Sequence, residues 1–197
     1  MRIINIGCWD GKQVKELLDK GYDAYGADIN TSRFLPEIKD KLFYLDITKP
    51  LPKTKPFDKQ FDVIYFEEVL EHLEEGKDRI ALSNLFKLLK PGGQFVLTTP
   101  RSVPYFQCYD PAWLRWKLKC GERHYHYGRE ELFSKITQAG FILGKTRLTG
   151  NLWWLFCRWI NLPLKHIFKS KRLLQAPRRK GFMGWEITAK KTLEVYQ

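Results

Sequence analysis

The sequence lacks any apolar run of the roughly 20 residues that a membrane-spanning helix needs. It also lacks an initial basic patch followed by an apolar core, so no secretory signal peptide is predicted. Only four cysteines occur among 197 residues, and they form no dense framework that would predict disulfides. We therefore expect a cytoplasmic protein in a reducing compartment.

Acidic residues are almost missing from one late part of the chain. Lys145–Lys191 holds 12 Lys or Arg and a single acid, Glu186, whereas the rest holds 22 basic and 21 acidic residues. The net charge of +12 is therefore local, and such asymmetry indicates an anionic partner surface. The apolar fraction of 44% and the length are ordinary for one domain with a sizeable core.

The start of the chain alternates between strand-like and helix-like segments. Arg2–Ile6 is a short β-prone run, and it is followed by a glycine turn over Gly7–Gly11 and by helix formers over Lys12–Lys20. A second strand is predicted over Tyr22–Ala27, with Asp28 at its end. This layout is typical of a nucleoside-binding unit, in which the acid accepts hydrogen bonds from a ribose diol.

The glycine turn lacks the Gly-x-Gly-x-x-Gly spacing of a dinucleotide site. Trp9 occupies the middle position, and no third glycine follows. A diphosphate must lie against bare backbone, so the bulky indole argues against it. A nucleoside without phosphate is compatible with this turn, and S-adenosylmethionine, with its adenine, ribose diol and amino-acid tail, is such a ligand.

Five segments in order resemble the motifs of class I S-adenosylmethionine-dependent methyltransferases. They are the glycine turn in Ile4–Gly11, the second strand in Tyr25–Asp28, the third in Phe43–Ile47, the fourth with its exit in Phe61–Leu73, and a Pro-Gly-Gly turn with the fifth strand in Leu88–Pro100. The resemblance implies an α/β fold: a doubly wound, Rossmann-like sheet of seven mostly parallel strands, with an antiparallel last strand beside the sixth and helices on both faces. We expect one methyltransferase domain over residues 1–197.

The resemblance places the cofactor contacts at the carboxyl ends of these strands. Asp28 would bind the ribose, Asp46 would face the adenine amino group, and Phe66 would line the pocket or lie in the core. The full expected set is Asn5, Gly7, Cys8, Trp9, Gly11, Asp28, Ile29, Asp46, Ile47, Phe66 and Glu67. Asn5 stands where the family usually has an acid near the methionine ammonium, and Trp9 replaces a usual glycine. The family's helical segment before the first strand is absent, which predicts an open or partner-completed pocket.

Histidines are the candidate catalytic groups. Methyl transfer needs an aligned nucleophile and exclusion of water, and a hydroxyl acceptor also needs a base. His126 is the first candidate and His124 the second, because both precede the helix predicted over Gly128–Ala139. The irregular, aromatic-rich insertion over residues 101–127 is expected to form the acceptor side of the pocket. Packing among neighbouring tyrosines would instead make these histidines structural.

No metal site is predicted. Glu68, Glu71 and His72 would share one face of a helix and could hold a hard cation there, as in a resembling subset of quinone O-methyltransferases. We favour local capping and packing for them. Cys120 and the two histidines named above have only loosely ligand-like spacing, with no second cysteine pair.

Residues 150–176 form a basic amphipathic segment between the last two predicted strands. Leu152–Leu162 is dense in aromatic and aliphatic residues, and Pro163 is expected to divide the segment into two short helices. Tryptophans on a wide apolar face beside a cationic stripe predict docking on an anionic membrane surface. Packing over the sheet and RNA binding are the alternatives; RNA is less favoured because the tryptophans cluster with aliphatic residues.

These observations predict a peripheral membrane enzyme that methylates an oxygen of a small or lipid-linked acceptor. A nucleic-acid methyltransferase is one alternative. Another is a binding protein of the same fold that has lost catalysis, with Asn5 and Trp9 as signs of that loss.

Overall fold

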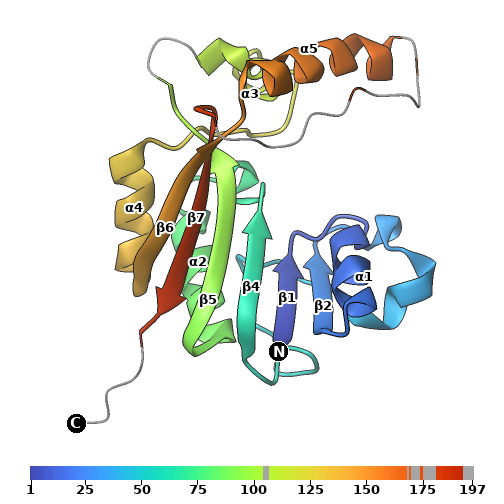
Figure 1. The fold of residues 1–197 in the computed structure, drawn as a ribbon, viewed down its shortest axis with the longest axis vertical. Helices are drawn as coiled ribbons and strands as arrows, with labels where there is room; N and C mark the ends of the chain where they lie inside the picture. Colours follow the sequence, from blue (N-terminus) through green and yellow to red (C-terminus); the bar gives the residue numbers. More distant parts are fainter. Residues whose placement is uncertain (104–106, 168, 170–173, 175–180, 193–197) are drawn as a thin grey trace.

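The structure is a computed structural model that describes all residues except 104–106, 168, 170–173, 175–180 and 193–197. Its seven-stranded sheet has the order β3-β2-β1-β4-β5-β7-β6 (Figure 1). The strands are β1 (Arg2–Ile6), β2 (Asp23–Asp28), β3 (Leu42–Tyr44), β4 (Phe61–Glu67), β5 (Leu89–Pro100), β6 (Phe141–Thr149) and β7 (Gly184–Lys191). The first five pair in parallel, and β7 runs antiparallel between β5 and β6. The predicted doubly wound sheet is therefore confirmed.

Helices cover both faces of the sheet. The α-helices of the described residues are α1 (Lys12–Asp19), α2 (Lys77–Leu88), α3 (Pro111–Lys117), α4 (Arg129–Gln138) and α5 (Leu152–His166), of which α1, α2 and α4 pack on the faces. The main core joins α2 and α4 to one face through buried residues such as Leu82, Leu85 and Ile136, and Val14 of α1 packs on the other face. Burial of each such side chain contributes about 1.5–3 kcal/mol, so helices and sheet stabilise one another.

The Pro-Gly-Gly segment differs from the predicted turn before the fifth strand. The helix that precedes it, α2, ends at Leu88, because Leu89 already pairs with Phe61 on β4. The pairing then shifts register before resuming at Val63 opposite Gln94, with Gly92 at a left-handed φ of 74°. The segment is therefore an irregularity within one long strand.

The second half of the chain contains two further departures. A helix, α3, forms within the insertion where no regular structure was predicted; Asp110 caps it by accepting the Ala112 N–H at 2.9 Å. The prediction that Pro163 divides the basic segment is wrong, because α5 continues through it as one helix. Both α3 and α5 lie in a layer above the carboxyl ends of the strands (Figure 1). Within the described part of the chain, no helix combines the length and apolarity needed to cross a membrane.

Candidate functional site

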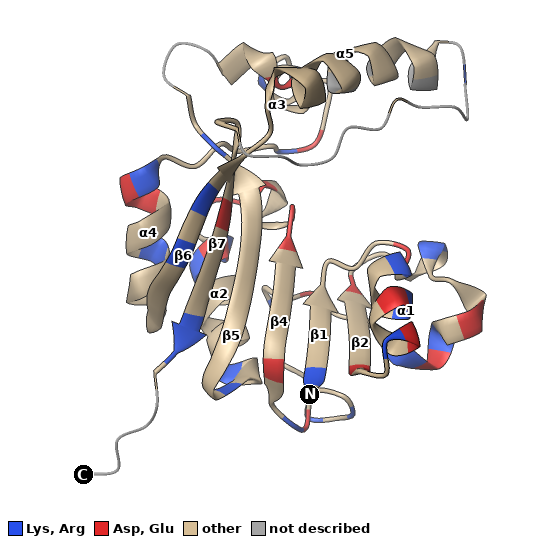
Figure 2. Cartoon of the chain, in the orientation of Figure 1, with Lys and Arg blue, Asp and Glu red and all other residues tan. Residues whose placement is uncertain are grey.

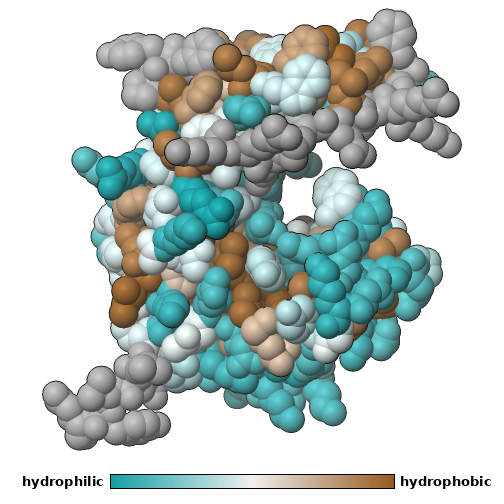
Figure 3. All heavy atoms as spheres, viewed as in Figure 1, coloured by the Kyte–Doolittle hydropathy of each residue, from teal (hydrophilic) through white to brown (hydrophobic). Residues whose placement is uncertain are grey.

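A cleft of about 460 Å³ opens at the carboxyl ends of β1, β2 and β4, within the size range of small-molecule sites. Its walls come from the turn after β1, the loop after β2, the segment after β3 and the exit of β4. Of the predicted cofactor residues, those that line it are Gly7, Trp9, Asp28, Ile29, Asp46 and Ile47. The space-filling view shows a hollow between the layer that carries α5 and the part of the molecule that carries α1 (Figure 3).

The glycine turn forms the floor of this cleft. Gly7 has a φ of 81°, and a Cβ placed there would lie 2.1 Å from a methyl carbon of Val69. Gly11 is also left-handed, with a φ of 91°. Cys8 points into the protein, where burial and the nearby Asp28 raise the pKa of its thiol to about 12. Gly11 and Cys8 therefore shape the turn without lining the cleft.

Asp28 is held firmly at the rim. One carboxylate oxygen accepts the N–H of Trp9 at 2.9 Å, and the other accepts the N–H of Asn30 at 2.9 Å. Each carboxylate oxygen can accept a further hydrogen bond, so the group remains able to bind a diol. The Trp9 indole is 58% exposed, with the Arg33 guanidinium 3.6 Å from its ring centroid. It forms one side of the rim and leaves the cleft open.

Asp46 is fixed by a local turn. Its Oδ1 accepts both the backbone N–H of Thr48 at 3.0 Å and the Thr48 hydroxyl at 2.7 Å. Partial burial alone would raise the pKa of Asp46, but the Thr48 hydrogen bonds outweigh burial and lower it overall. The carboxylate is therefore ionised at neutral pH and acts only as an acceptor.

Besides Cys8 and Gly11, three predicted cofactor residues lie outside the cleft lining, namely Asn5, Phe66 and Glu67. Phe66 is fully buried and packs against Phe95 in the core. Asn5 is 5% exposed, and its Nδ2 donates to Oε1 of Gln13. The Nε2 of Gln13 in turn donates to Oε2 of Glu67 at 2.9 Å. Sequence reasoning missed Gln13, although its place in the first turn of the helix after the glycine turn could have indicated it.

The predicted helical face of Glu68, Glu71 and His72 does not form. Glu68 is left-handed with a φ of 56°, and only Leu70–His72 forms a short 3-10 helix. Fully buried Glu71 accepts the Thr99 hydroxyl at 3.0 Å. His72 Nδ1 lies 2.8 Å from the Arg123 carbonyl oxygen, which can only accept, so Nδ1 carries the proton. Burial lowers the pKa of His72 and favours its neutral form.

A second cavity of about 360 Å³ adjoins the cleft on the side of the insertion. Its walls include Arg115, Gly121 and His124. His72 and Glu122 line both this cavity and the cleft, so the two spaces meet at these side chains. The insertion therefore supplies a separate compartment beside the first one.

Asp110 brings the two predicted catalytic histidines together. Its Oδ2 lies 3.0 Å from Nε2 of His124 and 3.4 Å from Nε2 of His126. Because a carboxylate only accepts, Nε2 of His124 donates, and its Nδ1 is left as a basic nitrogen. That buried Nδ1 has no hydrogen-bond partner among the described residues. His126 is buried behind it and stacks on Tyr109 at 5.4 Å between ring centroids.

The same side chains include potential metal donors. Donor atoms of Asp110, His124 and His126 lie within 4.8 Å of one another, as do those of Glu71, His72 and His124. In the Asp110 group, the contacts of Asp110 with the two histidines account for this proximity. Cys120 lies apart, exposed, with its thiol on the carbonyl of Arg115 at 3.3 Å. Asp110 was missed at the sequence level, although an acid before a proline is a helix-start signal.

Residues 1–143 match the model of a family described as a methyltransferase domain. The chain belongs to this family. No curated protein matches the chain in sequence. The family match confirms the prediction of a class I methyltransferase made from the glycine turn and the four segments that follow it.

Solved structures with the same fold include other methyltransferases. One SAM-dependent methyltransferase from Methanosarcina mazei has a TM-score of 0.67 at 19% identity, over 98% of this chain and 93% of that one. Another from Archaeoglobus fulgidus has a TM-score of 0.65 at 21% identity, over 96% and 86% of the two chains. The magnesium protoporphyrin IX methyltransferase of Synechocystis, which holds SAH, has a TM-score of 0.62 at 14% identity, over 98% and 74%. These likenesses show the shared methyltransferase fold.

Proposed function

We propose that this protein uses S-adenosylmethionine to methylate an oxygen of a small or lipid-linked acceptor. When bound, this cofactor supplies a methyl group already activated on a sulfonium. The observation that carries the proposal is the charge of the cleft. Among the described residues, four carboxylates line it, those of Asp28, Asp46, Glu68 and Glu122, against the single guanidinium of Arg33. Such a wall attracts a sulfonium cation and repels a diphosphate.

The cofactor roles follow from the geometry of the cleft. Asp28 accepts hydrogen bonds from the ribose, and Asp46 accepts one from the adenine amino group. Gly7 brings bare backbone to the ligand, while Trp9 and the apolar side chains after β2 and β3 enclose the adenosyl part. Solved methyltransferases of the same fold that hold S-adenosylhomocysteine support this cofactor.

The adjoining cavity is the proposed acceptor site. His124 lines it, whereas His126 lies behind, so the geometry favours His124 as the general base of this pair. Nδ1 of His124 takes the proton of the acceptor hydroxyl, and Asp110 stabilises the resulting imidazolium through Nε2. His126 shares Asp110 and helps to hold it in place.

Calorimetric titration with S-adenosylmethionine tests the cofactor assignment directly, with NADH as the diphosphate control. We expect heat from the first ligand and none from the second. No heat at millimolar S-adenosylmethionine would overturn the proposal and leave a binding protein of the same fold. Incubation of a cell extract with methyl-labelled cofactor, comparing wild type with His124→Asn, then identifies the acceptor as the labelled metabolite that only the wild type forms.

Peripheral docking on an anionic membrane is the second part of the proposal. One side of α5 is exposed and apolar, with Leu152 at 69%, Trp153 at 55% and Phe156 at 50% exposure. The other side is anchored: Cys157 is buried, and Nε1 of Trp159 donates to the Tyr109 carbonyl at 2.8 Å. The packing of α5 therefore leaves its side with Leu152, Trp153 and Phe156 exposed, and we call this side the apolar ridge.

The surroundings of this ridge match an anionic surface. Figure 2 shows no acidic residue along α5, and Figure 3 shows hydrophobic residues gathered over it. The sequence around it is basic, although much of that stretch, including Arg172 and Arg178–Lys180, lies outside the described residues. Vesicle sedimentation in parallel with RNA binding separates the membrane proposal from a nucleic-acid substrate, which would give salt-sensitive RNA binding and no vesicle preference.

A further inference from the structure

Asn5 occupies the position at which this family usually places an acid beside the methionine ammonium, yet it is unsuited to that role. Its side chain is neutral and only 5% exposed. The one donor bond recorded for its amide goes to Gln13 rather than toward the cleft. A ligand ammonium has three donors and is best met by an ionised acceptor, so the charge must come from elsewhere.

Glu67 is the nearest connected acid. Asn5 pairs with Tyr65 across β1 and β4, so Asn5, Tyr65 and Glu67 project on the same face of the parallel pair. Gln13 bridges the gap, accepting from Asn5 and donating to Oε2 of Glu67 at 2.9 Å. The two amides are thus oriented with their donors toward the carboxylate, which fixes its position.

Among the described residues, only Gln13 is seen to donate a hydrogen bond to the Glu67 carboxylate. Glu67 is the last residue of β4, only partly buried, and the next residue, Glu68, lines the cleft. Oε2 is the oxygen engaged by Gln13, and Oε1 is available for another donor. Glu67 does not itself line the cleft, but it directly precedes Glu68 of the cleft wall, at the carboxyl end of the sheet.

We propose that Glu67 provides the negative charge for the ammonium of the S-adenosylmethionine tail, and that Gln13 and Asn5 are positioning residues that hold it. This inference rests on the proposed function, because it concerns one end of the same ligand. In this chain the acid of the family has effectively moved from the end of β1 to the end of β4. Asn5 is then a working part of the site rather than a sign of lost catalysis.

The test compares two ligands that differ only in the tail. S-Adenosylmethionine carries the ammonium, whereas 5′-methylthioadenosine keeps the adenosyl part and lacks the amino acid. We expect Glu67→Gln to weaken S-adenosylmethionine about 10- to 100-fold, the loss of a hydrogen bond to a charged group, and to change 5′-methylthioadenosine less than twofold. Glu16→Gln, an exposed acid on α1, is the matched control and leaves both affinities unchanged.

Two further variants keep the test decisive. Gln13→Ala releases the carboxylate without removing it, so it weakens S-adenosylmethionine by a smaller factor and spares 5′-methylthioadenosine. Asn5→Asp added to Glu67→Gln restores the acid at the usual position and recovers most of the lost affinity. Equal weakening of both ligands, or of neither, by the folded variants overturns this inference. Failure of the wild type to bind either ligand overturns the proposed function instead.

Discussion

The cleft and the layer above it are built in different ways. Around the cleft, backbone groups set the geometry. Gly7 is left-handed, Asp28 and Asp46 each accept the N–H two residues further on, and Asp28 also accepts the N–H of Trp9, 19 residues away on the glycine turn. In the upper layer, side chains join distant segments, as when the Tyr109 hydroxyl donates to the Met183 carbonyl at 2.8 Å, 74 residues along the chain. The cleft therefore depends on which strands are neighbours in the sheet, whereas the upper layer depends on single side-chain contacts between segments far apart in the chain.

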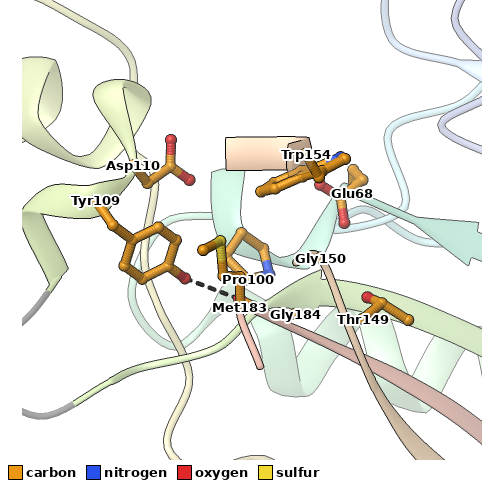
Figure 4. A pocket seen from close by; sticks show the side chains of 9 residues that line it. All are labelled: Glu68, Pro100, Tyr109, Asp110, Thr149, Gly150, Trp154, Met183 and Gly184. Carbon is orange, nitrogen blue, oxygen red and sulfur yellow. Dashed lines mark hydrogen bonds between the residues drawn. The ribbon is translucent and has the colours of Figure 1, made fainter. Parts of the chain in front are cut away.

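The junction between the two regions is tight. Figure 4 shows Glu68 of the β4 exit beside Trp154 of the upper layer, with Tyr109 and Asp110 on the other side of the same small pocket. The pocket they line has only about 10 Å³ of free space, about that of one water. The cleft and the upper layer are therefore in contact, so a change in one region can be tested for its effect on the other.

The largest effect is expected at Asp28. Asp28→Ala removes the ribose acceptor and the partner of the Trp9 and Asn30 amides, so S-adenosylmethionine affinity should fall at least about 100-fold. Calorimetry measures this fall. Asp19→Ala, an exposed acid on α1, serves as the control and should bind normally. A change of less than about threefold for Asp28→Ala would remove the ribose assignment.

The affinity of the protein for membranes should change only with substitutions in the upper layer. Trp153→Ser with Phe156→Ser removes two exposed rings, each worth about 1.5–3 kcal/mol on burial, so partition onto anionic vesicles should fall at least about tenfold. Cofactor affinity should not change. Ile142→Ser, equally exposed at 57% but on β6, is the matched control. Unchanged pelleting of the double variant would contradict membrane docking through α5.

A third change probes the boundary between the regions. Asp110→Asn weakens the contacts to His124 and His126 and replaces the cap acceptor of α3, so we expect a loss of about 1–3 kcal/mol in stability. Hydrogen exchange should quicken within residues 107–127 and stay unchanged in β1 and β2. Faster exchange throughout the sheet would mean that the two regions unfold together.

The smallest effect concerns pH. Burial is the main cause that lowers the pKa of His72, with His124 acting in the same direction and the Arg123 carbonyl, Glu122 and Glu68 opposing it. From pH 7 to 5 the unfolded chain, with a histidine pKa near 6.5, takes up a proton that the folded chain resists. Stability therefore falls over this range.

The variant His72→Asn removes this titration while keeping a donor for the Arg123 carbonyl. Its free energy of unfolding should decline less steeply between pH 7 and 5 than that of the wild type, while the two agree in slope above pH 8. Denaturant melts at each pH measure the slopes. Parallel slopes at every pH would show that His72 titrates alike in the folded and unfolded chains.

The sequence predicted the cleft better than the upper layer for a physical reason. Gly7, Asp28 and Asp46 follow strands whose order and direction set where they meet, so spacing along the chain was enough. The helical face expected after β4 does not form. Buried Glu71 instead binds Thr99 on β5, and no local sequence pattern encodes this contact. Pro163 remained inside α5, whose flank is anchored by Trp159 on Tyr109. Gln13 and Asp110 each act through one side chain, and a single residue leaves only a weak signal in the sequence.

The exposed indole at the rim of the cleft gives the protein a built-in optical reporter. Trp9 lies under a guanidinium and beside the space that the adenosyl group would fill, so ligand entry changes the surroundings of one fluorophore among seven. Subtracting the emission of Trp9→Phe from that of the wild type isolates this signal. Stopped-flow mixing can then follow cofactor arrival and departure in real time, without any label and without knowledge of the acceptor.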